Sequence, residues 1–131
     1  MKDDSGRHLN RAAELLRVAK SLIENGFPAD SVGRSYYAMF HAATALLMEL
    51  GVERTSHHGI VSAFSEFVVR KGIMENRYHQ HFHRAFEARH NSDYRSVPPY
   101  AKEGAESLLQ NATEFVGACR AFLEKNDAGA A

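Results

Sequence analysis

The stretch DSVGRSYYAMFHAATALLMELG, residues 30–51, decides the fold of this chain. Large apolar side chains recur in it every three or four positions, which places them on one face of an α-helix. The GFPAD segment before it is typical of a turn, and Gly51 is a helix terminator. We therefore predict a helix that begins near Pro28 or Asp30 and ends at Leu50. Its core-facing stripe consists of Tyr36, Phe40, Ala43, Leu47 and Leu50.

The same helical spacing occurs on both sides of this stretch, and no segment shows the alternation of a β-strand. Gly26 and Gly72 are expected to end helices, and Ser56 has the side chain of an N-cap. The two prolines of RSVPP, residues 95–99, cannot continue a helix. Short connections between long amphipathic helices predict an all-α fold, an antiparallel up-and-down bundle of four to five helices. The further helices are expected over residues 7–25, 56–72, 75–94 and 100–125.

The chain has 131 residues, of which 44% are hydrophobic and 24% charged, as in ordinary globular proteins. This length suits one domain, expected over residues 7–125, followed by a disordered tail over residues 126–131. Cys119 is the single cysteine, which excludes an internal disulfide and fits a reducing compartment. The polar N-terminus is not typical of a signal peptide, and no stretch is apolar enough to cross a membrane. We therefore expect a cytoplasmic protein without a membrane contact.

The charge balance limits the kinds of partner. Lysine and arginine together number 16, as do aspartate and glutamate, so the formal net charge is zero at neutral pH. The chain as a whole is not a polyelectrolyte binder, and any contact with nucleic acid must come from a local basic patch. The 8 histidines can add positive charge below neutral pH.

The segment HQHFHRAFEARHNSDY, residues 79–94, has an unusual composition for a helix. On a helical wheel its apolar face, which includes Phe82 and Phe86, continues at three-and-four spacing to Arg89 and then to Asp93. A charged pair at core-facing positions is costly unless the two groups pair. It can be a structural ion pair that fixes helix packing, or it can hold an arginine at the mouth of a cleft to meet a phosphate. The opposite, solvated side is expected to hold Arg77, Arg84, Ala88 and Asn91.

Within this segment, His79 and His83 are one helical turn apart, as paired metal ligands on one helix are. However, the carboxylate of the HExxH pattern is missing, and no further ligands are spaced to complete a zinc site. We therefore expect no metal site and no other cofactor. These histidines are interpreted as partly exposed side chains beside the core.

The helix over residues 30–50 has a second polar edge, made by Arg34, Tyr37 and His41 at positions i, i+3 and i+7. Arg34 and His41 can both approach a phosphate, and neither is a good core residue. If this helix and the one over residues 75–94 are neighbours, its polar edge converges with a second set of side chains. That set is Arg89, His90 and Asp93.

Three motifs, in order along the chain, carry a resemblance to a known family. They are GRSYYAMFH over residues 33–41, SHHG over residues 56–59, and RHNSDY over residues 89–94. With the helical pattern from Leu9 to Phe122, they resemble the HEPN (higher eukaryotes and prokaryotes nucleotide-binding) domain family, and most closely its stand-alone prokaryotic branch. The motif positions are Arg34, Tyr36, Tyr37, Phe40 and His41, then Ser56, His57 and Gly59, then Arg89, Ser92, Asp93 and Tyr94.

The resemblance implies an antiparallel helical bundle, usually a homodimer, that works on nucleotides or RNA. It also implies a minimal nucleotidyltransferase as partner, because many members form a two-component or toxin–antitoxin pair with one. Some members are metal-independent ribonucleases, whose signature is an arginine, four to six further residues and a histidine. No histidine follows Arg89 at that spacing, whereas six residues separate Arg34 from His41.

Three hypotheses for the function follow. The first is a HEPN-type nucleotide- or RNA-binding protein that works with a nucleotidyltransferase. The second is a metal-independent endoribonuclease toxin, in which a histidine acts as acid or base and an arginine holds the phosphate. The third is a dimerisation module without a ligand. The sequence does not decide whether the protein is an enzyme. The candidate catalytic residues are Arg34, His41, Arg89 and His90. The candidate nucleotide- or RNA-binding residues are Arg34, Tyr37, Arg89, Asp93 and Tyr94.

Overall fold

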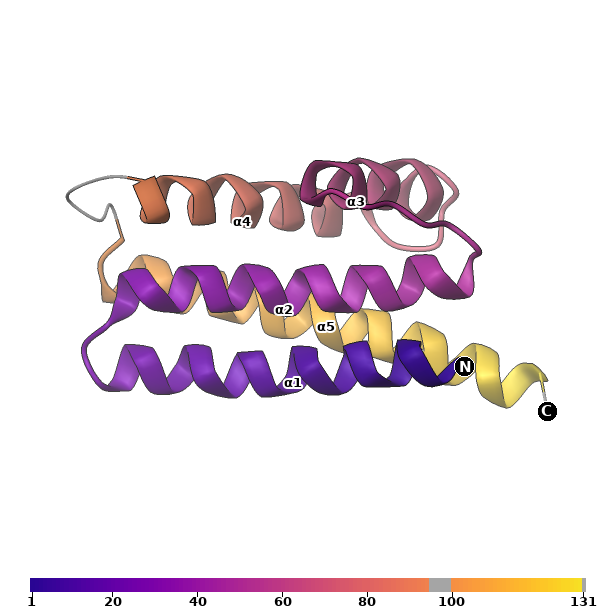
Figure 1. Ribbon diagram of the computed structural model, residues 1–131, viewed down its shortest axis with the longest axis horizontal. Helices are drawn as coiled ribbons and strands as arrows, with labels where there is room; N and C mark the ends of the chain where they lie inside the picture. The colour runs from indigo at the N-terminus through magenta and orange to yellow at the C-terminus, as the bar shows by residue number, and fades with distance from the viewer. Residues whose placement is uncertain (95–99, 131) are drawn as a thin grey trace.

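The computed structural model describes residues 1–94 and 100–130, and these form α-helices with one π-helical turn (Figure 1). No strand occurs in the described part of the chain, so the predicted all-α bundle is confirmed. Helices α1 and α4 run in one direction, and α2 and α5 run in the other (Figure 1). The elements are α1 (Asp3–Glu24), α2 (Pro28–Glu49), α3 (His57–Phe64), the π-helical turn η1 (Ser65–Val69), α4 (Asn76–Tyr94) and α5 (Lys102–Ala130).

Helix α2 is the central helix, because it packs against α1, α3, α4 and α5. Its small alanines let the neighbouring helices approach closely, and its larger side chains fill the space between them. The buried surface is therefore wider than the predicted stripe and also includes Met39 and Leu46. Phe40 is only partly buried, and Leu50, at the C-cap, is exposed. The prediction that Leu50 lies in the core is wrong.

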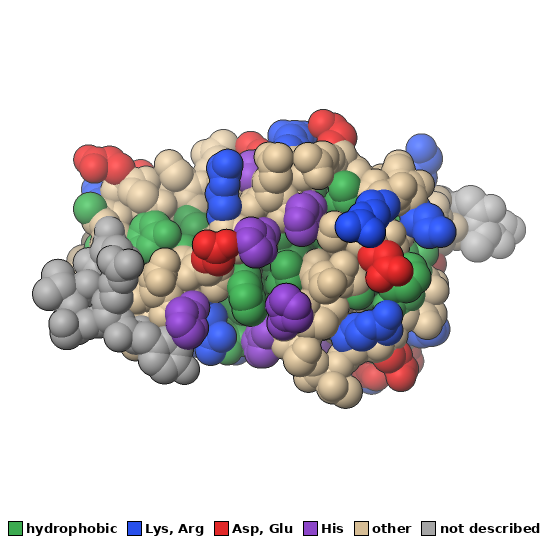
Figure 2. All heavy atoms as spheres, turned by 90° about the horizontal axis from the view of Figure 1, so that it is seen from above, with side chains coloured by type: hydrophobic (Ala, Val, Ile, Leu, Met, Phe, Trp, Pro, Cys, Tyr) green, Lys and Arg blue, Asp and Glu red, His purple; other side chains and the backbone are tan. Residues whose placement is uncertain are grey.

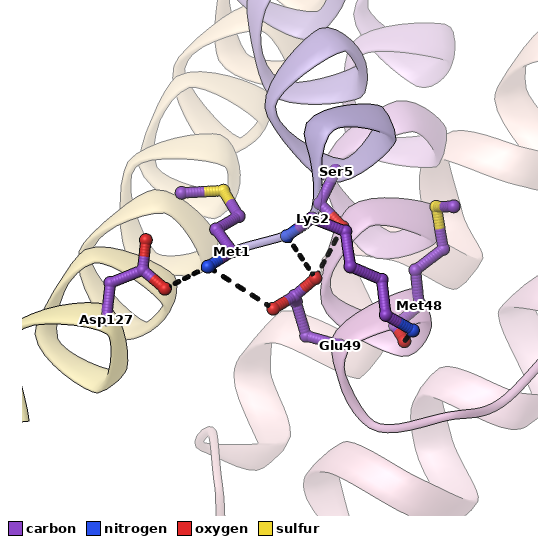
Figure 3. A network of polar contacts seen from close by, with 6 residues as sticks. All are labelled: Met1, Lys2, Ser5, Met48, Glu49 and Asp127. Carbon is purple, nitrogen blue, oxygen red and sulfur yellow. Dashed lines mark hydrogen bonds and ion pairs between the residues drawn. The ribbon is translucent and has the colours of Figure 1, made fainter. Parts of the chain in front are cut away.

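Polar contacts explain why α1 and α5 are longer than expected (Figure 3). Helix α1 begins at Asp3 instead of residue 7, and Ser5 there donates a hydrogen bond of 2.8 Å to the Glu49 carboxylate. Helix α5 continues to Ala130 instead of ending at residue 125, and its Asp127 carboxylate accepts a hydrogen bond from the Met1 ammonium. Residues 126–130, expected to form a disordered tail, are therefore helical.

The helix expected over residues 56–72 is divided into two parts. Ser56 is its N-cap, as predicted, because its hydroxyl accepts a hydrogen bond of 2.9 Å from the Gly59 N–H. The α-helical part ends at Phe64, and the π-helical turn η1 follows it. Gly72 then has a φ of +77°, which suits glycine and ends this helical region as expected.

The wheel misplaced one residue of α4. Ala88 was expected on the solvated side but is buried together with Ile23, Val32 and Ala105. The reason is that α4 packs against α5 as well as against α2, so that it buries a broader face than a helix with one neighbour. In the part of the chain that the structure describes, no helix is long and apolar enough to span a membrane.

Candidate functional site

Arg89, near the end of α4, extends toward α2. Its Nε lies 3.2 Å from a carboxylate oxygen of Asp93, one turn further along α4. Its guanidinium carbon lies 5.2 Å from the ring centroid of Tyr37 and 5.9 Å from that of Tyr36. These contacts stabilise the cation through the carboxylate and the faces of two aromatic rings. The predicted Arg89–Asp93 ion pair is therefore present, and Arg89 is held in one place.

The ion pair does not satisfy Arg89 completely. Its Nε is buried, yet among the described residues it has no partner with the geometry of a hydrogen bond. A buried donor without such a bond is unusual in proteins and calls for an explanation. The Asp93 side chain is 47% exposed, so the pair lies at a surface, where solvent or a ligand can reach it.

An open cleft of about 550 Å³ lies where α2, the end of α4 and the turn between α1 and α2 meet. Four of the predicted binding residues, two from α2 and two from α4, line it together. The fifth, Tyr94, has a side chain outside the described part of the chain. Two arginines and two aspartates make the formal charge of this lining zero. The lining consists of Leu22, Phe27, Asp30, Gly33, Arg34, Tyr37, Arg89 and Asp93.

Phe27 is a residue of the cleft that the sequence analysis missed. It is the N-cap of α2, and 55% of its surface is exposed, so its ring is accessible to a ligand. An exposed aromatic ring beside two arginines is the combination with which proteins bind single-stranded nucleic acid. The sequence could have predicted this exposure, because Phe27 lies in the GFPAD turn and a turn has no helix face that would bury the ring.

His57 is a second residue that was not among the predicted site residues. Its Nδ1 lies 2.7 Å from the Tyr36 hydroxyl, and its ring stacks on Phe40 at a centroid distance of 4.4 Å. Burial, and then the positive charge of Arg89, lowers the pKa of His57 below its ordinary value. An imidazole thus lies within the electrostatic reach of Arg89 and is held neutral at neutral pH.

His41 does not lie with Arg34. Its Nδ1 is 2.9 Å from Nδ1 of His8, so it packs against α1, about 10 Å along the α2 axis from Arg34. Burial, and then the charges of His8, Arg11 and His57, lowers the pKa of His41 to about 4. Arg34 thus lines the cleft, whereas His41, two turns along the same helix, contacts His8.

His90 follows Arg89 on α4 and is exposed, and it is not among the described residues that line the cleft. Of the four candidate catalytic residues, only Arg34 and Arg89 thus share a site. In residues 1–94 and 100–130 no group of three or more His, Cys, Asp or Glu side chains is placed to hold a metal ion.

Comparison with known protein families identifies the family of this chain. The profile of the HEPN domain matches residues 5–122. The chain belongs to the HEPN domain family. This membership confirms the resemblance, and the matched residues include every residue that lines the cleft.

Three relatives of this HEPN protein have similar lengths. A Methanocaldococcus jannaschii protein named "Putative toxin MJ0605" is 34% identical over 87% of this chain and 84% of the relative. A UPF0332 protein of Thermotoga maritima is 31% identical over 87% of this chain and 86% of the relative. A UPF0332 protein of Archaeoglobus fulgidus is 30% identical over 95% of this chain and 98% of the relative.

Proposed function

We propose that this HEPN protein binds a nucleotide or a short single-stranded segment of RNA in the cleft between α2 and α4. One observation carries the proposal. Arg34, Tyr37, Arg89 and Asp93 come from two helices that are far apart in the sequence, and they line one open cleft. A structural ion pair alone would need neither the exposed Arg34 nor the exposed ring of Phe27 beside it.

The chemistry of the lining favours a nucleotide over a simple anion. Arg34 and Arg89 offer guanidinium groups that can donate paired hydrogen bonds to a phosphate. Asp30 and Asp93 repel an isolated anion, but they can accept hydrogen bonds from ribose hydroxyls or from the amino group of a base. Phe27 provides a face for base stacking. The cleft thus matches a ligand that carries a phosphate, hydroxyl groups and an aromatic ring.

The biological setting is proposed from the family. The protein would work in the cytoplasm as a homodimer, in a two-component or toxin–antitoxin pair with a minimal nucleotidyltransferase. The toxin wording in the name of the M. jannaschii relative supports such a role. The nucleotidyltransferase would bind the HEPN protein and control its access to RNA.

A metal-independent ribonuclease is the second candidate function, and the position of His57 favours it. The reaction requires a base for the ribose 2′-hydroxyl, an acid for the leaving 5′-oxygen and a cation for the phosphorane. Arg89 can provide the cation, and His57 is a neutral imidazole within its electrostatic reach. His41 is a weaker candidate, because it is paired with His8 outside the cleft.

In the third alternative, a dimerisation module without a ligand, the Arg89–Asp93 pair only fixes the packing of α4. That alternative predicts that Arg89→Ala destabilises the fold and changes no ligand affinity. Arg34→Ala would then have no effect on either property, because Arg34 is exposed.

Calorimetric titration with nucleoside monophosphates and short single-stranded RNA tests the proposal. We expect Arg34→Ala to weaken RNA binding and to reduce the slope of log K against log salt by about 0.7, the effect of losing one phosphate contact. The matched control is Arg84→Ala, because Arg84 is an exposed arginine of α4 that lies outside the cleft. Absence of binding to every ligand, or equal losses in both variants, would contradict the proposal. RNA cleavage in EDTA that disappears in His57→Gln would establish the ribonuclease.

A further inference from the structure

A second groove, of about 320 Å³, lies on the other side of α4, between this helix and the α3–η1 region. Histidines gather on the face of the molecule that α3 and α4 form, around apolar side chains (Figure 2). Two of its lining residues are Phe86 and His58, whose ring centroids are 6.5 Å apart. The other lining residues are Val61, Ser62, Ser65, Glu66, Arg70, His79 and His83.

The charged and titratable groups that face this groove come from all the elements around it. Helix α3 contributes His58, and the η1 turn with the residue after it contributes Glu66 and Arg70, whose charges offset each other. Helix α4 contributes His79 and His83. Glu87, also on α4, forms an ion pair with His83. When His58, His79 and His83 are protonated, their three positive charges exceed the one remaining negative charge, that of Glu87, and the groove becomes positive.

Among the described residues no carboxylate forms an ion pair with His79, whereas His83 is paired with Glu87. Burial, then His83, and then Arg70 lowers the pKa of His79 below its ordinary value. Its Nδ1 is buried and has no hydrogen-bond partner among the described residues. The rings of His79 and His83 stack at a centroid distance of 6.1 Å, so their two charges would repel each other at close range. An anion between them and Arg70 would remove that repulsion.

We propose that this histidine groove is a second ligand site, which binds the phosphate group of a nucleotide or of an RNA strand. Arg70, His79 and His83 would pair with the phosphate oxygens, and the hydroxyls of Ser62 and Ser65 would donate further hydrogen bonds. One wall of the groove is the π-helical turn, a form of helix that is frequent at functional sites. His79 is about 15 Å along α4 from Arg89, so a single RNA strand could reach both sites.

The direct test uses inorganic sulfate, a tetrahedral dianion whose charge does not change near neutral pH. The histidine ring signals are followed by NMR during a sulfate titration at constant ionic strength in chloride, at about pH 5.5 and about pH 7.5. We expect saturable shifts of the His79 and His83 signals, with an affinity about tenfold or more higher at the lower pH. Sulfate should also raise the pKa of His79.

Two variants define the site. The double variant His79→Gln/His83→Gln should lose sulfate binding, whereas His81→Gln, between them on α4 but outside the groove, should keep it. The proposal is overturned if sulfate shifts these signals no more than chloride does, if the double variant binds like the wild type, or if the affinity is the same at both pH values. Circular dichroism of each variant verifies the fold.

A further pair of titrations identifies the source of the phosphate and is independent of the α2–α4 cleft. In Arg34→Ala/Arg89→Ala, sulfate should still bind, because the groove is intact. In the wild type, an RNA affinity that rises at low pH, with the rise lost in His79→Gln/His83→Gln, supports an RNA strand. Sulfate binding without such a rise supports a free nucleotide or phosphate ion.

Discussion

The α2–α4 cleft and the histidine groove lie on two sides of the same helix, and they differ in how their charge is held. In the cleft, Arg89 is charged at every physiological pH and is fixed by Asp93 and two tyrosine rings. In the groove, most of the positive charge depends on histidine protonation, and the neighbours of His79 oppose it. The comparison shows that two pairs with the same i, i+4 spacing on one helix differ in charge because one contains an arginine and the other consists of histidines, whose charge depends on pH.

The largest effect on the cleft is expected from Arg89→Ala. Loss of charge-assisted hydrogen bonds to a phosphate should weaken nucleotide or RNA binding by about 1.5–3 kcal/mol, roughly tenfold to a hundredfold. This loss should be similar at all pH values at which the protein is folded, unlike any loss at the groove. Calorimetry of Arg89→Ala and Arg89→Lys measures it, and the lysine variant should recover only part of the affinity because it lacks the guanidinium fork. A loss restricted to low pH would contradict the distinction between the two sites.

A smaller effect is expected from Phe27→Ala. If the ring stacks on a base, RNA affinity should fall by about 1–2 kcal/mol, while the affinity for inorganic phosphate stays unchanged. The melting temperature should change little, because the side chain is 55% exposed. Phe27→Tyr keeps an aromatic face and is the matched control. An equal loss of phosphate binding would show that Phe27 supports the cleft instead of the base.

Protonation of His41 is expected to change the stability of the fold with pH without changing ligand binding. Its pKa of about 4 in the folded protein is lower than the 6.5 of an ordinary histidine. The folded state therefore binds fewer protons than the unfolded chain, and stability that is complete above pH 6.5 is lost as the pH falls toward 4. After allowance for solvent screening, the loss should be about 1–2 kcal/mol.

Chemical denaturation of His41→Gln at several pH values measures this loss. The variant should have a flatter acid limb than the wild type. The sulfate affinity of the groove should be unchanged in His41→Gln, because neither His41 nor its contact His8 lines the groove. Identical pH profiles for the wild type and His41→Gln would contradict this account of the His8–His41 pair.

The smallest effect is expected from Asp93→Asn. Removal of the carboxylate leaves Arg89 without its ion-pair partner, so inorganic phosphate should bind the cleft a few times more tightly. Stability should fall by less than about 1 kcal/mol, because the pair is partly exposed. Asp127→Asn, at the far end of α5, is a control that removes an equal charge. If both variants gain the same phosphate affinity, the gain comes from net charge and not from Arg89.

Much of the fold follows from the sequence because helical spacing depends on local geometry. The period of three and four residues places Tyr36 and Phe82 in the core, and the i, i+4 spacing brings Arg89 to Asp93. The packing of one helix on another is not contained in that spacing. Ala88 is buried by α5, which a wheel of α4 alone cannot show.

The site could be predicted only in part, because it too depends on which helices pack against each other. The four cleft residues from α2 and α4 were expected to converge only if the two helices were neighbours, and they are. His41 was expected on the same helix edge as Arg34, and the spacing along that edge could not show that α1 provides His8 as its contact. Phe27 belongs to the turn between α1 and α2, where side chains follow no periodic pattern. Its position at the cleft depends on how α1, α2 and α4 are arranged, which a helical pattern does not show.

The most direct test of the central claim is an NMR titration of the wild-type protein with a short single-stranded RNA. We predict that the ring signals of Phe27 and Tyr37 and the Nε–H signal of Arg89 shift together and saturate at one affinity, before the signals of other residues. RNA that binds without shifting these three signals, or that does not bind at all, would contradict the account.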